Sequence, residues 1–164
     1  MESWSRKSHG DDVSRKTLVV GVGSPIRGDD AVGPVVGERL QSALGDDCIF
    51  EPFQGSGLDL LGILAQEDPP DRVVIIDSIV SGQVPEGQVV RVQTDGLAGS
   101  SCLSSHHVGV FEAFNLARRL GVAIPEVRLY AVGIRRVDGF REGLSESLAC
   151  KVDEAVRRIL DDLS

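Results

Sequence analysis

The chain has 164 residues, a length that suits one domain. Hydrophobic residues make up 41% and charged residues 26% of it, proportions typical of a globular protein. The net charge of −8 argues against nucleic acid or a membrane surface as the main partner, because both are anionic and would repel the chain. No apolar run approaches the roughly 20 residues that are needed to span a bilayer.

The N-terminal segment indicates where the folded domain begins, and the cysteines indicate the compartment of the protein. Residues 1–16 mix both charges and lack the apolar core of a signal peptide, so we expect a flexible extension there and one domain over 17–164. Cys48, Cys102 and Cys150 are an odd number without CxxC spacing, which predicts reduced thiols in a cytoplasmic protein. Aromatic residues make up only 4% of the chain, no interface patch is evident, and we expect a monomer.

Short apolar runs alternate with helical patterns along the chain. Strands are expected in five segments: TLVVGVG (17–23), CIFEPF (48–53), RVVIID (72–77), GQVVRVQ (87–93, alternating and therefore at an edge) and EVRLYAVGI (126–134). Helices are expected from Gly33–Pro34, over 57–66, from Ser105 to a cap at Gly121, and from a cap at Ser145 to the C-terminus. This order predicts an α/β fold, with a mostly parallel twisted sheet of about five strands and helices on both faces.

Five polar side chains are expected at or near one rim of that sheet. Asp29 and Asp30 follow the first strand, Asp77 ends a buried strand, and His106 and His107 begin a helix. Ligands of open α/β sheets bind beyond the carboxyl ends of the strands. Two carboxylates and an imidazole there would suit a divalent metal such as nickel or zinc, or an acid–base cluster without metal. Each residue also has a structural interpretation, as a helix cap, a turn-binding carboxylate or a polar surface histidine.

The glycine-rich loop GVGSPIRGDDAVGP (21–34) does not have the pattern of a phosphate-binding loop. The dinucleotide fingerprint is GxGxxG, whereas GVGSPIRG has four residues between its second and third glycines. Adjacent aspartates would also repel phosphate oxygens unless a cation intervened. A nucleotide-binding domain is therefore the weaker alternative, and the chain has no GxSxG nucleophile elbow.

Taken together, five segments resemble the hydrogenase maturation endopeptidases, which trim the C-terminal tail of the large subunit of nickel–iron hydrogenases. The segments are VVGVGSPIRGDDAVGP, QGSGLDLLGIL, VVIIDSIVSG, SSHHVGVFEAFNLARRLG and YAVGIRR…REGLSESL, in matching order over nearly all of residues 17–163. The resemblance implies a three-layer α/β/α sandwich, nickel as the metal recognised, and a hydrogenase large-subunit precursor as partner.

The same resemblance assigns roles by position. It implies Asp30, Asp77 and His106 as metal ligands, with His107 in a variable place. We expect the nickel to arrive in the precursor, and Asp30 and Asp77 to act in cleavage, with Asp29 as a candidate general base or a brace of the turn. A non-enzymatic, metal-dependent binding protein for the precursor is the alternative, since its rim cluster would look the same.

Two positions depart from the family pattern. Ala31 stands where a glycine usually follows the acidic pair, and GIRRVDGF is unusually basic for a segment near the site. Arg135 or Arg136 is therefore a candidate to contact a carboxylate of the substrate.

Overall fold

The computed structural model describes residues 15–54, 57–93, 105–137 and 139–164, except for the side chains of residues 57 and 105–111. Strands and helices alternate along the chain, as the sequence predicts. The strands are β1 (Thr17–Val22), β2 (Cys48–Phe53), β3 (Arg72–Val80), β4 (Val89–Val92) and β5 (Glu126–Ile134). The α-helices are α1 (Val32–Leu44), α2 (Gly57–Leu64), α3 (Ser105–Arg119), α4 (Glu146–Ala149) and α5 (Val152–Leu163), with short 3-10 turns η1 (Gly28–Ala31) and η2 (Gly45–Asp47).

The five strands form one sheet in the order β2-β1-β3-β5-β4. The first four are mutually parallel, and β4 is antiparallel to β5 at the edge. The edge position that was predicted for the alternating segment 87–93 is confirmed, although its ladder covers only Val89–Val92. Among the described strands only β4 is antiparallel, so the carboxyl ends of the other four lie at one rim.

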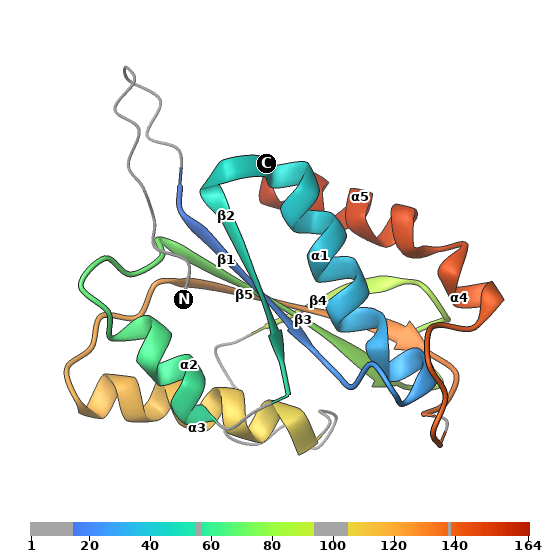
Figure 1. The fold of residues 1–164 in the computed structure, drawn as a ribbon, viewed down its shortest axis with the longest axis horizontal. Coiled ribbons are helices and arrows are strands. Elements are labelled where there is room, and N and C mark those ends of the chain that lie inside the picture. The colour runs from blue at the N-terminus through green and yellow to red at the C-terminus, as the bar shows by residue number, and fades with distance from the viewer. Residues whose placement is uncertain (1–14, 55–56, 94–104, 138) are drawn as a thin grey trace.

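Helices cover both faces of the sheet, so the expected three-layer α/β/α sandwich is confirmed (Figure 1). On one face α1, α4 and α5 pack against a core that includes Val19, Val74 and Ile76. On the other face α2 and α3 pack against a core that includes Val20, Val73 and Ile75. Among the described residues, no helix is both long enough and apolar enough to cross a bilayer.

Two boundaries differ from the sequence-based expectation. The sequence predicts that β3 ends at Asp77, but the strand continues to Val80. The pairing with β1 ends at Ile76, whereas β5 pairs with the whole of β3 and keeps its last residues in the sheet. The single C-terminal helix expected after Ser145 is instead α4 and α5, broken at residues 150–151. Its apolar stripe continues across the break, since Leu148 and Val152 enter the same core.

Two of the cysteines lie in the described part of the chain, and both are free thiols. Cys48 is buried at the start of β2, and this burial raises the pKa of its thiol to about 11, against a smaller opposing effect of Arg72. Cys150 is exposed, and Cys102 lies outside the described residues. The prediction that the thiols are reduced stays a prediction.

Close backbone contact explains the glycines that flank the acidic pair. A Cβ atom on Gly33 would lie 2.2 Å from the carbonyl oxygen of Val22 and 2.6 Å from that of Ile76. A Cβ atom on Gly21 would lie 2.7 Å from the Cα of Pro34. The glycines therefore let the first turn of α1 rest directly on the ends of β1 and β3.

We predict that Gly33→Ala destabilises the fold by about 1–3 kcal/mol, because the new methyl group overlaps two strand carbonyls. Gly62→Ala in α2 is the matched control, since a Cβ atom there meets nothing within 4 Å. The control should gain about 0.5–1 kcal/mol from helix propensity. Urea unfolding monitored by circular dichroism measures both changes, and equal stability of the two variants would contradict the packing argument.

Candidate active site

Asp30 lies directly beyond the end of β1, in the turn η1 that leads into α1. Its side chain is nearly buried, with 4% of the residue exposed. Its Oδ2 accepts a hydrogen bond from the backbone N–H of Ser24 at 3.0 Å, and its Oδ1 accepts one from the hydroxyl of Ser78 at 3.0 Å. Burial of a carboxylate is tolerated only with such donors, so the loop and β3 jointly hold Asp30 in place.

Asp77 lies on β3, just past the last residue of that strand that pairs with β1, and it is fully buried. Its Oδ1 accepts a hydrogen bond from the backbone N–H of Ser78 at 2.6 Å. Ser78 thus donates to both carboxylates, with its hydroxyl to Asp30 and its amide to Asp77. The structure therefore brings the two predicted acids to one rim and links them through a single serine.

The alternation of side chains along β3 directs these neighbours to opposite faces of the sheet. Val73 and Ile75 belong to the core under α2 and α3, whereas Val74 and Ile76 belong to the core under α1 and α5. By the same alternation, Asp77 points to the side of α3 and Ser78 to the side of α1. Asp77 is therefore directed toward the layer that contains the histidine segment.

His106 and His107 lie in the first turn of α3, but their side chains are outside the described residues. The helix ends at Arg119, shortly before β5 begins at the opposite rim, so its first turn lies toward the rim of Asp77 (Figure 1). Among the residues whose side chains are described, no group of three could hold a metal ion. The metal-ligand role of His106 therefore stays a prediction.

Asp29, the first of the acidic pair, is bound to a different part of the chain. Its Oδ1 accepts a hydrogen bond from the backbone N–H of Ser145 at 2.7 Å, and its Oδ2 accepts one from the Ser145 hydroxyl at 3.0 Å. The adjacent loops are also joined, since Gly28 N–H donates to the carbonyl of Arg141 and Arg141 N–H donates to that of Ile26. These contacts favour the bracing role of Asp29; its role as a general base stays a prediction.

Two of the serines that hold the acids, Ser24 and Ser78, are not identified by any pattern in the sequence. Ser78 directly follows Asp77, and Ser24 directly follows the glycine that ends GVG, so their positions beside the motifs were the available signal. Ser145 was correctly placed at the start of a helix, but its side chain makes no capping hydrogen bond, because its hydroxyl donates to Asp29 instead.

Comparison with known proteins decides the family. The family model described as "Hydrogenase maturation protease" matches residues 55–162, more than half of the chain. The chain belongs to this family. Since the family is one of proteases, the chain is a peptidase, and this favours cleavage over the alternative of a non-enzymatic binding protein. The matched range contains Asp77 and His106, whereas Asp29 and Asp30 lie before it.

Solved structures extend the similarity to the N-terminal half. The hydrogenase maturating endopeptidase HybD from E. coli has a TM-score of 0.69 at 24% identity and covers 90% of this chain and 91% of its own. The HybD protease from Thermococcus kodakarensis has a TM-score of 0.66 at 22% identity, covering 90% and 98%. Both identities support the fold alone. A solution structure of an E. coli endopeptidase has a TM-score of 0.69 at 25% identity, covering 90% and 91%. No curated protein sequence matches the chain.

We predict that Ser145→Ala destabilises this protease by about 1–2 kcal/mol, because it removes one hydrogen bond from the buried carboxylate of Asp29. Ser42→Ala is the matched control, since that hydroxyl is exposed and bonds only a carbonyl of its own helix. The control should change stability by less than about 0.5 kcal/mol. Chemical unfolding measures the free energy of unfolding of both variants. An unchanged value for Ser145→Ala would contradict the bracing role of Asp29.

Proposed function

We propose that this protease removes the C-terminal extension of a nickel–iron hydrogenase large-subunit precursor after nickel insertion, and that it recognises the bound nickel. Asp30 and Asp77 would bind the metal as oxygen ligands, and His106 would add a neutral nitrogen. The observation that carries the proposal is the pair of buried carboxylates at the rim, linked by Ser78.

The chemistry of these donors fits a divalent ion. Within the described part of the chain, each oxygen of Asp30 accepts one hydrogen bond, and a carboxylate has about four acceptor sites, so capacity for a metal remains. Two nearly or fully buried carboxylates at one rim also concentrate negative charge, which a dication would neutralise. Mixed oxygen and imidazole donors without a thiolate suit a borderline metal such as nickel.

Burial of the two aspartates implies that recognition is coupled to docking. Asp77 has no exposed surface and Asp30 has very little, so the chain around the rim must open before either reaches a metal in the precursor. Opening the rim would break the hydrogen bonds that Ser24 and Ser78 donate to Asp30, and a precursor without nickel would offer no metal in their place, so the protease would release it uncut. This coupling would make nickel insertion the checkpoint for cleavage.

Cleavage itself would take place beside the same carboxylates. A divalent ion, when bound there, can polarise the scissile carbonyl or lower the pKa of a water molecule. The residues of this chain would position the metal-loaded segment, and a carboxylate would accept the proton from water. Asp29 is the candidate for that base, provided that its hydrogen bonds from Ser145 are replaced by one from water when the rim opens.

Substitutions at the rim test the proposal. Asp30→Asn and Asp77→Asn should each slow cleavage of a nickel-loaded precursor by at least about a hundredfold, since even the loss of a group that supports a metal ligand costs roughly 10–100-fold. His106→Ala should have a similar effect, and His107→Ala a smaller one. Mass spectrometry of the released C-terminal peptide measures the rate, and circular dichroism checks the fold of each variant.

Asp46→Asn is the control for charge, because Asp46 is exposed in η2 at the opposite rim. It should cleave at the rate of the unmodified protease. Native rates for Asp30→Asn and Asp77→Asn would overturn the ligand assignment, and complete loss in His107→Ala alone would assign the histidine role to His107 instead of His106. Cleavage of nickel-free and nickel-loaded precursor at equal rates would overturn the proposal that nickel insertion is the checkpoint for cleavage.

A further inference from the structure

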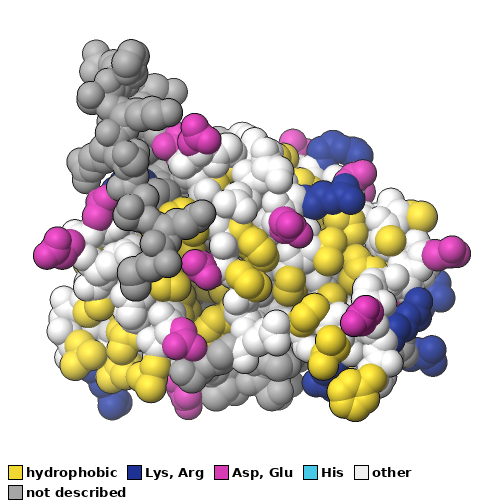
Figure 2. Space-filling model, in the orientation of Figure 1, with side chains coloured by type: hydrophobic (Ala, Val, Ile, Leu, Met, Phe, Trp, Pro, Cys, Tyr) yellow, Lys and Arg dark blue, Asp and Glu magenta, His cyan; other side chains and the backbone are white. Residues whose placement is uncertain are grey.

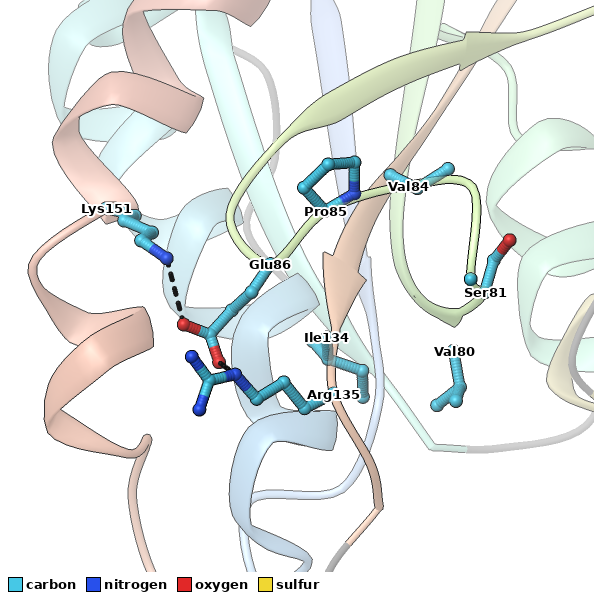
Figure 3. A pocket seen from close by; sticks show the side chains of 9 residues that line it. Val80, Ser81, Val84, Pro85, Glu86, Ile134, Arg135 and Lys151 are labelled. Carbon is cyan, nitrogen blue, oxygen red and sulfur yellow. Dashed lines mark hydrogen bonds and ion pairs between the residues drawn. The ribbon is translucent and has the colours of Figure 1, made fainter.

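A pocket of about 490 Å³ lies beside the candidate active site but does not include its aspartates. It is lined by the end of β3, the connection from β3 to β4, the end of β5 and Lys151 at the start of α5 (Figure 3). Its apolar lining comes from Val80, Val84, Pro85 and Ile134. Val80 follows Asp77 by three residues along β3, a distance of roughly 10 Å in a strand.

Two glycines shape this pocket. A Cβ atom on Gly133 would lie 2.2 Å from the carbonyl oxygen of Pro85, so glycine lets the β3–β4 connection lie against β5. Gly87 has a φ of +80°, and a Cβ atom there would lie 2.4 Å from the Lys151 side chain. Glycine at this position therefore leaves room for the Lys151 stem to cross the connection on its way to Glu86.

Glu86 is the buried charge of the pocket, with 5% of its side chain exposed. Its Oε1 accepts a hydrogen bond from Lys151 Nζ at 2.9 Å. This hydrogen bond holds the pKa of Glu86 below its ordinary value despite the opposing effect of burial. The carboxylate is therefore ionised and serves as the fixed anion between two cations.

Arg135 is the second cation, and its side chain is largely exposed beside the pocket. Its Nε lies 3.0 Å from Glu86 Oε2, yet that oxygen has no hydrogen-bond partner among the described residues. The contact is therefore an ion pair, which keeps the guanidinium, with its five N–H donors, beside the pocket. Since 74% of the Arg135 side chain is exposed, those groups can reach an incoming acceptor.

The charges of the cluster favour an anion as that acceptor. One carboxylate faces two cations, so Glu86, Arg135 and Lys151 together have a net charge of +1 in a protein whose net charge is −8. In the orientation of Figure 1, Figure 2 shows Lys and Arg side chains gathered at the right-hand end of the molecule, where β5 ends. A guanidinium binds a carboxylate through two parallel hydrogen bonds, more specifically than an ammonium group does.

We propose that this pocket is a substrate subsite, in which Arg135 binds a carboxylate of the precursor polypeptide about three residues from the scissile bond. The apolar lining would take the side chain next to that carboxylate, and Glu86 would act as the positioning residue for Arg135. The identity of the ligand rests on the proposed function, in which the precursor is cleaved beside Asp77. An extended peptide at Asp77 would reach the pocket within about three residues.

Short peptides test the subsite without cleavage. The probes are acetyl-Ala-Val-Glu-Val-amide, with a side-chain carboxylate, and acetyl-Ala-Val-Gln-Val, with a terminal carboxylate. The control peptide is acetyl-Ala-Val-Gln-Val-amide, which has neither. Each is titrated to millimolar concentration into the full-length protein, and binding is measured from the backbone amide shifts of Gly82 and Gly87. At least one acid should bind about tenfold more tightly than the neutral peptide, and the tighter one identifies the source of the carboxylate.

Protein variants assign that preference to Arg135. Arg135→Gln should lose the roughly tenfold preference for the acid, and Arg135→Lys should retain part of it, because the charge remains without the planar fork. Arg119→Gln is the matched control, since Arg119 is exposed at the last turn of α3 near the opposite rim. It should bind the acid as the unmodified protein does.

Equal affinity for acid and neutral peptides, no saturable binding of any acid, or unchanged binding by Arg135→Gln would each overturn the subsite. Cleavage of the nickel-loaded precursor is measured separately. Retained cleavage without Arg135-dependent binding would reject the subsite alone. Arg135-dependent binding without any cleavage would reject the proposed function and leave a carboxylate site whose natural ligand is another peptide.

Discussion

The hydrogen bond from the Ser78 hydroxyl to Asp30 is the contact on which the arrangement of the rim depends. It joins the turn after β1 to the part of β3 that extends beyond β1. Without it, one oxygen of a nearly buried carboxylate would lose its donor, a loss that costs more than an ordinary hydrogen bond contributes. The same serine donates its amide to Asp77, so the two acids cannot be arranged independently.

The surrounding backbone makes that contact possible. Gly33 allows α1 to begin against the carbonyls of β1 and β3, and this close approach sets where η1 lies. Asp29 then binds Ser145 and attaches the same turn to the start of α4. Adjacent aspartates therefore have different partners: Asp30 is held toward the rim, and Asp29 toward the C-terminal helices. The pocket around Glu86 lies farther along β3, where β5 is the remaining parallel neighbour.

Much of this could be predicted from local pattern. The apolar strands, the parallel order and the position of Asp30 and Asp77 beyond or near strand ends follow from periodicity and from the rule for open α/β sheets. The length of β3 could not, because residues 78–80 are strand only by pairing with β5. The partner of Ser145 and the break between α4 and α5 also depend on contacts between distant segments. Glu86 gave no signal as a charge centre, since Arg135 and Lys151 are far from it in sequence.

X-ray absorption at the nickel edge shows whether Asp30 and Asp77 bind the nickel of the precursor. The nickel-loaded precursor would be measured alone and after mixing with an equimolar amount of protease, frozen before cleavage is complete. We expect additional oxygen scattering in the nickel coordination shell of the complex, and we expect this scattering to be lost with Asp30→Asn and Asp77→Asn. An unchanged nickel spectrum in a complex that goes on to cleave would contradict it.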